Sequence, residues 1–146
     1  MHVLTDPRGA VRYLVCKTLG GRSEVVEVLF RYFVLNESPG DLEHRYGVGR
    51  FKIRGYAQRL VEKVGSHRAA ARLLLACYGE LLSVKPVVHP ANNGRSVVYY
   101  CNACGKLVAK PEEHVRKSHR GTVEVVVERC WRRFVGEVRR WGAERR

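Results

Sequence analysis

Two cysteines and two histidines have the residue types and the spacing of a metal site. Two residues separate Cys101 from Cys104, and four separate His114 from His119. A tight turn with the first spacing aims two thiolates at one ion, and Gly105 gives that turn backbone freedom. A short helix with the second spacing turns two imidazoles toward the same ion. Two sulfurs and two nitrogens complete a tetrahedron, so we expect one structural, non-catalytic Zn²⁺ per chain.

A short helix is predicted to carry both histidines. Pro111 suits a first helical position, and Glu112 and Glu113 suit a first turn because the amino-terminal end of a helix attracts negative charge. This helix would hold His114 and His119 on its inner side.

The segment resembles the Cys₂His₂ zinc-finger family at its four ligands. Tyr99 also stands where that family has an aromatic residue two positions before the first cysteine. The resemblance implies a small ββα-like unit, over residues 95–121, that folds around structural zinc. It covers about twenty residues, and nine residues lie between Cys104 and His114, where the family has about twelve. The core of the unit is left to three apolar residues: Leu107, Val108 and Val115.

The charge of the chain indicates a polyanionic partner. The 146 residues include 27 basic residues, of which 20 are Arg, against 14 acidic ones, and the net charge is +13. Guanidinium groups bind phosphate in a bidentate manner and stack on bases, which favours nucleic acid. The alternative explanation for the many charged residues is a thermophile's composition, in which they form surface ion-pair networks. That explanation predicts equal numbers of basic and acidic residues.

The first 90 residues are predicted to form a helical domain. Asp6-Pro7 starts a helix that Gly20-Gly21 ends, and a second helix opens at Ser23. A loop over residues 36–40 follows, and Gly65 and Ser66 separate two later helices. Cys16, Cys77 and Cys130 fall at apolar helical positions, so we expect them to be buried rather than joined in disulfides.

Residues 40–57 resemble the helix-turn-helix family of DNA-binding proteins. Leu42 and Tyr46 give a short first helix its apolar stripe, and Gly47 supplies the left-handed turn residue. Buried positions of the second helix would be Ile53, Tyr56, Ala57 and Leu60. The sequence departs from the family at Glu43, where a small residue is usual, and at Gly49, which replaces a Ser or Thr cap.

The resemblance implies that the start of the second helix faces nucleic acid. Its expected contact residues are Arg45, Arg50, Lys52, Arg54 and Arg59. Residues 45–72 hold eight basic residues against one acidic, so positive charge is concentrated there. An ordinary helical hairpin with a solvated basic face is the alternative.

A hairpin and a long helix are predicted to complete the chain. Strands at residues 84–88 and 96–100 would be joined through Asn93-Gly94, like a wing, with His89 in the loop and Arg95 at the tip as an expected phosphate contact. Residues 122–146 would form a basic amphipathic helix. We expect that helix to bury Val127, Cys130, Phe134, Val138 and Trp141, against the first domain or in a homodimer.

The sequence shows no convincing nucleophile with its base and no phosphate-cradling glycine loop, so we do not expect an enzyme. Without a signal peptide or an apolar run of about 18 residues, we expect a cytoplasmic protein that does not enter membranes. We predict a DNA-binding transcriptional regulator. The alternatives are a protein-interaction adaptor and an RNA-binding or ribosome-associated protein. Contacts for RNA would lie on the finger and the last helix, at Arg116, Lys117, Arg120, Arg132 and Arg133, with Arg139 and Arg140.

Overall fold

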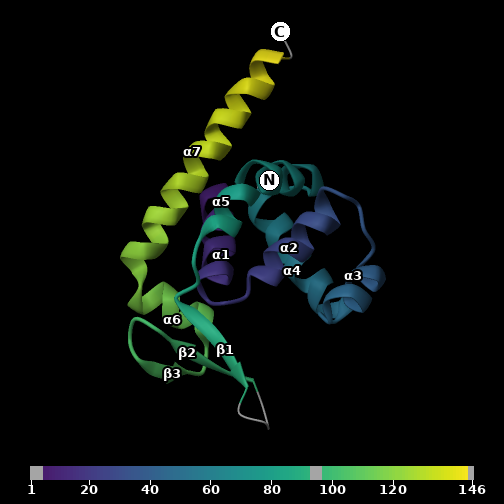
Figure 1. The fold of residues 1–146 in the computed structure, drawn as a ribbon. Coiled ribbons are helices and arrows are strands. Elements are labelled where there is room, and N and C mark those ends of the chain that lie inside the picture. The colour runs from purple at the N-terminus through teal and green to yellow at the C-terminus, as the bar shows by residue number, and fades with distance from the viewer. Residues whose placement is uncertain (1–4, 93–96, 145–146) are drawn as a thin grey trace.

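A computed structural model describes residues 5–92 and 97–144 as a helical bundle with a small sheet beside one end (Figure 1). The elements are, in order, α1 (Pro7–Leu19), α2 (Ser23–Phe33), α3 (Pro39–Tyr46), α4 (Arg50–Val64), α5 (His67–Ser83), β1 (Val88–Asn92), β2 (Val97–Cys101), β3 (Lys106–Val108), α6 (Pro111–Ser118) and α7 (Arg120–Glu144). The predicted fold class, mainly α with a small antiparallel sheet and a long last helix, is therefore confirmed. Within the described residues, no helix has the length and apolarity needed to cross a membrane.

The helix boundaries follow from local sequence signals. The Asp6 carboxylate accepts a hydrogen bond from the Gly9 N–H at 2.9 Å and so caps α1. Ser38 and Ser66 cap α3 and α5 in the same way. Gly65 ends α4 with φ of 99°, a left-handed conformation that glycine adopts without strain.

Helix α1 lies in the middle of the bundle, in contact with α2, α4, α5, α6 and α7. Its apolar residues Val11, Leu14 and Val15 are fully buried. The same hydrophobic cluster continues into the sheet at Cys101 and into α6 at Val115. The bundle and the metal-site segment therefore share one core. The three cysteines outside the expected metal site, Cys16, Cys77 and Cys130, are buried and free, as predicted.

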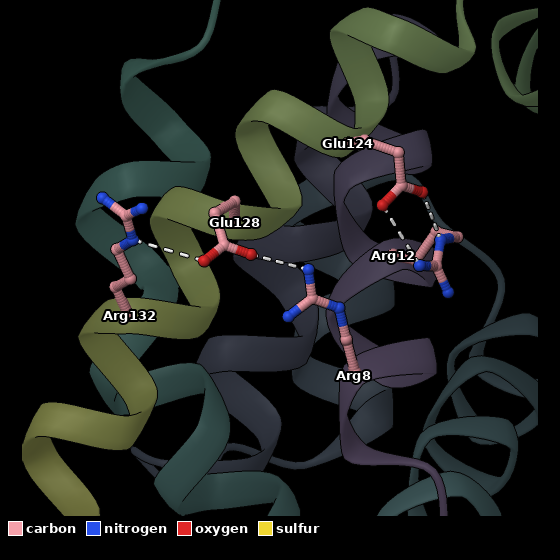
Figure 2. Close-up of polar contacts among 5 residues, drawn as sticks. All are labelled: Arg8, Arg12, Glu124, Glu128 and Arg132. Carbon is pink, nitrogen blue, oxygen red and sulfur yellow. Dashed lines mark hydrogen bonds and ion pairs between the residues drawn. The ribbon is translucent and has the colours of Figure 1, made fainter.

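The cations of α1 are paired with glutamates from the end of the chain. Arg8 donates to Glu128 at 2.7 Å and Arg12 donates to Glu124 at 2.8 Å, and Arg132 donates to the other oxygen of Glu128 at 3.2 Å (Figure 2). Pairs this exposed add little net stability. Their order along the two helices fixes α7 antiparallel to α1.

The sheet differs from the prediction in where its first strand lies. Residues 84–87 are not a strand, and β1 instead includes His89 and Pro90, which were expected in a loop. β1 is an edge strand in the order β1-β2-β3, where the missing N–H of Pro90 is tolerated. The Val87 N–H donates to the Leu19 carbonyl, and the Val87 carbonyl accepts a hydrogen bond from the Asn102 N–H. The first of these bonds holds residues 84–87 against the end of α1. The predicted turn at Asn93-Gly94 and Arg95 lie outside the described residues.

Helix α7 differs from the prediction in where it begins and in how much of its second half is buried. It begins at Arg120, two residues before the predicted helix, and buries Val127 and Cys130 as expected. Its second half extends past the bundle (Figure 1). There Val138 is 45% exposed, and Phe134 and Trp141 are only half-buried. The cause is that α1 begins at Pro7 and its Arg8 lies over the Trp131 ring, so that beyond Trp131 the described part of the chain packs α7 mainly against α5.

Two identical substitutions on α7 test this packing. We expect Val127→Ala to lower the free energy of unfolding by about 2 kcal/mol, because two fully buried methyl groups are removed. The same change at the exposed Val138 should cost less than about 0.5 kcal/mol. Urea denaturation at two protein concentrations measures both. An equal, concentration-dependent loss at Val138 would place that residue in a subunit contact instead.

Candidate metal centre and cationic surfaces

The first half of the candidate metal centre is the turn between β2 and β3. Cys101 ends β2, and Cys104 follows in the turn. The Cys104 N–H donates to the Cys101 sulfur at 3.4 Å, and the Gly105 N–H donates to the Cys101 carbonyl at 2.8 Å. Gly105 has φ of 68°, so the glycine is needed to close the turn. This backbone places both sulfurs on the side of the hairpin that faces α6.

The second half comes from α6. Both histidines turn their Nε2 atoms to the sulfurs: His119 lies 3.3 Å from Cys101 and 3.5 Å from Cys104, and His114 lies 3.5 Å from Cys104. All four ligand atoms lie within 4.8 Å of one another. A tetrahedron with metal–sulfur bonds of about 2.3 Å and metal–nitrogen bonds of about 2.05 Å has sulfur–nitrogen edges of about 3.5 Å. The cluster therefore has the dimensions to hold one metal ion.

The environment of the cluster suits a structural ion. Cys101 is fully buried, the two histidines are half-buried, and only Cys104 is exposed. Burial lowers the pKa of His114, and the neighbouring His119 lowers it further, which favours the neutral ring that a metal requires. Four ligands would complete the coordination of a tetrahedral ion.

The core of the metal-site segment was only partly predicted. Val115 is fully buried and Val108 is half-buried, but Leu107 is 64% exposed, so its predicted core position is wrong. Leu107 pairs across the sheet with Tyr100, which is also exposed, whereas Val108 pairs with Tyr99, which packs against the core. Side chains alternate between the faces of a sheet, so only one of these pairs can face the bundle. The apolar cover that Leu107 was expected to give comes from the helical bundle.

The predicted helix-turn-helix segment forms a compact helical hairpin. Gly47 adopts φ of 71° at the end of α3, as expected for the turn. Leu42 and Ile53 are buried and form a small cluster with Val28 of α2. Glu43 accepts a hydrogen bond from the Arg50 N–H at 2.5 Å, and this bond supplies the cap that Gly49 lacks.

Some of the expected contact residues of the hairpin are held in ion pairs and others are not. Arg45 is paired with Glu37 at 3.0 Å and Arg50 with Glu43 at 3.3 Å. Among the described residues, Lys52 and Arg54 form no ion pair, and both side chains are exposed. The Arg54 guanidinium lies 5.9 Å from the ring of Phe51, which is 78% exposed. The start of α4 therefore presents an exposed aromatic ring among cations.

The remaining candidate residues fall into two groups. Arg59 and Arg116 line a hollow between α1, α4 and α6, and Lys117 and Arg120 line a second hollow beside it. Arg132 and Arg133, on α7, are paired with Glu128 and Glu80 and line neither hollow. Sequence reasoning did not identify several other cations of the first hollow: Arg12, Lys17, Arg22, Lys63 and Lys110.

A nearly buried ion-pair cluster joins the bundle to α6 in the first hollow. The Lys17 ammonium lies 3.0 Å from Glu112 and 4.7 Å from the centre of the Tyr56 ring, and its side chain is 7% exposed. Arg22 lies 3.2 Å from Glu112 and donates to the Tyr56 hydroxyl at 2.6 Å. Burial acts to raise the pKa of Glu112, but Lys17 and Arg22 outweigh it and lower that pKa.

Chelation tests the metal centre. We expect the purified chain to contain one metal ion, and His119→Ala to lose it, because three ligands cannot close the site. Removal of the ion should unfold residues 97–119 first, while α1 to α5 stay folded. Elemental mass spectrometry and hydrogen exchange measure these changes. His44→Ala, at an exposed position of α3, is the control; a metal-free chain with an unchanged melting curve in chelator would refute the site.

The pH dependence of stability tests the ion-pair cluster. We expect Glu112→Gln to lower the free energy of unfolding by about 2 kcal/mol at pH 7, because Lys17 loses its partner. Since the pKa of Glu112 is lowered in the folded protein, this difference should persist above about pH 4.3 and shrink as the pH falls through the folded pKa. Glu113→Gln, which removes an exposed partner of Lys117, is the control and should cost less. A difference that does not depend on pH would contradict the assignment.

Comparison with known proteins gives no match to any protein-family model, curated protein or solved structure.

Proposed function

We propose that this protein is a zinc-stabilised nucleic-acid-binding protein, and that it acts on duplex DNA as a transcriptional regulator. The observation that carries the proposal is the start of α4, where the exposed Phe51 ring stands between Arg50, Lys52 and Arg54. A ring placed among cations can stack on bases or contact thymine methyl groups while the cations hold phosphate.

The hairpin supports this end of α4 as a rigid binding element. Ile53 and Leu42 anchor α4 and α3 to α2, so the exposed residues of the first turn project from a fixed backbone. Glu43 holds the Arg50 N–H and leaves the other backbone N–H groups of the first turn to attract phosphate. The ion pair of Arg50 with Glu43 is exposed, so a phosphate can replace the carboxylate at low cost.

Zinc is the ion that the donor set favours. Two thiolates and two imidazoles in a tetrahedron match structural Zn²⁺, whereas the common iron–sulfur clusters use four thiolates. In this role Cys101, Cys104, His114 and His119 would hold the ion, and α6 would be tied through it to the β2–β3 hairpin. No step of nucleic-acid binding passes through it.

Folded RNA is the second candidate partner. It is favoured by the carboxylate partners of Arg45 and Arg50, which reduce the charge of the hairpin, and by Arg116 and Arg120, which form no ion pair with any described residue. Such cations near the metal centre suit an RNA-binding or ribosome-associated protein, because RNA is recognised largely through its shape and its phosphates.

Salt titration of duplex DNA binding tests the proposal. We expect Lys52→Gln with Arg54→Gln to weaken binding about tenfold and to reduce the slope of log affinity against log salt by about 0.9 for each lost phosphate contact. Phe51→Ala should weaken binding and relax base preference without changing that slope, since a neutral ring releases no counterions. Fluorescence anisotropy with duplex DNA and a hairpin RNA measures both.

The matched control is Lys85→Gln with Arg129→Gln, two exposed cations outside both hollows and outside the α3–α4 hairpin. This control removes the same net charge and should change affinity less than twofold. Equal losses in both double variants would mean that net charge alone attracts the DNA. If the α4 variants bind normally and RNA binds more tightly than DNA, the regulator hypothesis fails and the RNA-binding one stands.

A further inference from the structure

Two cationic hollows lie next to each other on the surface of α1. The first, of about 870 Å³, lies between α1, α4 and α6, and the second, of about 580 Å³, lies where α1 meets α6 and α7. Arg12 and Arg116 line both hollows, so the two are adjacent. We call the two hollows together the α1 trough.

The trough holds more cations than its own carboxylates can neutralise. Seven Lys and Arg residues line the first hollow, against one Asp and two Glu. Lys17 and Arg22 share Glu112, and Arg12 is paired with Glu124. Across the described parts of the chain, no carboxylate makes a direct ion pair with the trough residues Arg59, Lys63, Arg116 and Arg120. Arg116 and Arg120 act only at longer range on Glu113 and Glu124, whose pKa values they help to lower. The excess of cations in such a cluster attracts an anion.

A buried tyrosine at the wall of the trough lies beside one of these cations. Burial raises the pKa of Tyr13, and the positive charge and N–H groups of Arg59 oppose that rise, so the two side chains are close. The contact is too imperfect to count as a regular hydrogen bond of the buried hydroxyl. Arg59 therefore keeps N–H groups free for an anion oxygen next to Tyr13.

The α4 wall connects the trough to the start of α4. Lys52, Tyr56, Arg59 and Lys63 follow one another at intervals of three or four residues, which places them on one face of the helix. From Lys52 to Lys63 this face is about 17 Å long, at 1.5 Å per residue. This face therefore leads from Lys52 at the start of α4 to Arg59 and Lys63, which line the trough.

We propose that the α1 trough binds the phosphate backbone of a nucleic acid, as a second contact surface separate from the start of α4. This inference rests on the proposed nucleic-acid function. Arginine is the main unpaired cation of the trough, and its guanidinium binds two phosphate oxygens at once. The trough reads no base sequence, because its charges meet only the backbone, so it adds affinity without specificity.

The test removes two trough cations, Arg59→Gln with Arg116→Gln, and keeps Lys85→Gln with Arg129→Gln as the control for net charge. Both trough residues are exposed, so the fold should be unaffected. Binding is measured by anisotropy in a salt series, with a labelled duplex of about twenty base pairs, with the single strand and with poly-glutamate as competitor. Inorganic tripolyphosphate is titrated separately by calorimetry.

We expect the trough variant to bind the oligonucleotide about tenfold more weakly, with a salt slope smaller by about 1.4 to 1.8 for two lost phosphate contacts, and the control to change less than twofold. Base preference should be unchanged. If the trough variant behaves like the control while the wild-type chain binds nucleic acid, the trough inference is wrong and the proposed function stands.

Three other outcomes are also decisive. A wild-type chain that binds none of the nucleic acids would refute the proposed function. If the wild-type chain then still binds tripolyphosphate and the trough substitutions abolish that binding, the trough is a phosphate site for a small ligand. If the wild-type chain does not bind tripolyphosphate either, the trough is not a phosphate site. Competition by poly-glutamate as strong as that by the oligonucleotide, at equal charge, would assign the trough to an acidic protein instead.

Discussion

The structure depends on the enclosure of a charged helix. Helix α1 is surrounded by five other helices, yet it carries Arg8, Arg12 and Lys17. Only Lys17 loses nearly all of its water: its side chain is 7% exposed, and a buried cation needs a compensating charge, which Glu112 of α6 supplies. Arg8 and Arg12 stay more than a third exposed, and their pairs with Glu128 and Glu124 of α7 add little. The burial of α1 at Lys17 therefore requires α6 to pack on it with Glu112 opposite.

Features set by neighbouring residues were predictable from the sequence. Asp6, Ser66 and Gly47 act within a few positions of themselves, and each marks a helix end in the structure as expected. Features set by distant packing were not. The burial of Val138 depends on how far α1 extends beside α7, and the position of β1 depends on the bonds from Val87 to Leu19 and Asn102.

The metal centre could likewise be predicted from neighbouring residues, whereas the trough could not. The four metal ligands lie within nineteen residues, and spacing alone indicated them, because turn and helix geometry fix their directions. The trough combines residues from α1, α4 and α6, which are separated by up to a hundred positions. Lys17 was hidden from sequence reasoning because it lies in an apolar stripe, where a charge is not expected unless its partner is known. Only the fold shows Glu112 opposite it.

The position of His119 has a mechanical consequence. His119 is the residue between α6 and α7, and its ring also faces the two sulfurs of the metal centre. An ion bound there would tie this elbow to the β2–β3 turn. The direction of α7 comes from its packing on α1 and α5, where Val123, Val127 and Cys130 are buried. The 25 residues of α7 form a rod about 37 Å long, so this packing over its first half decides where its exposed end points.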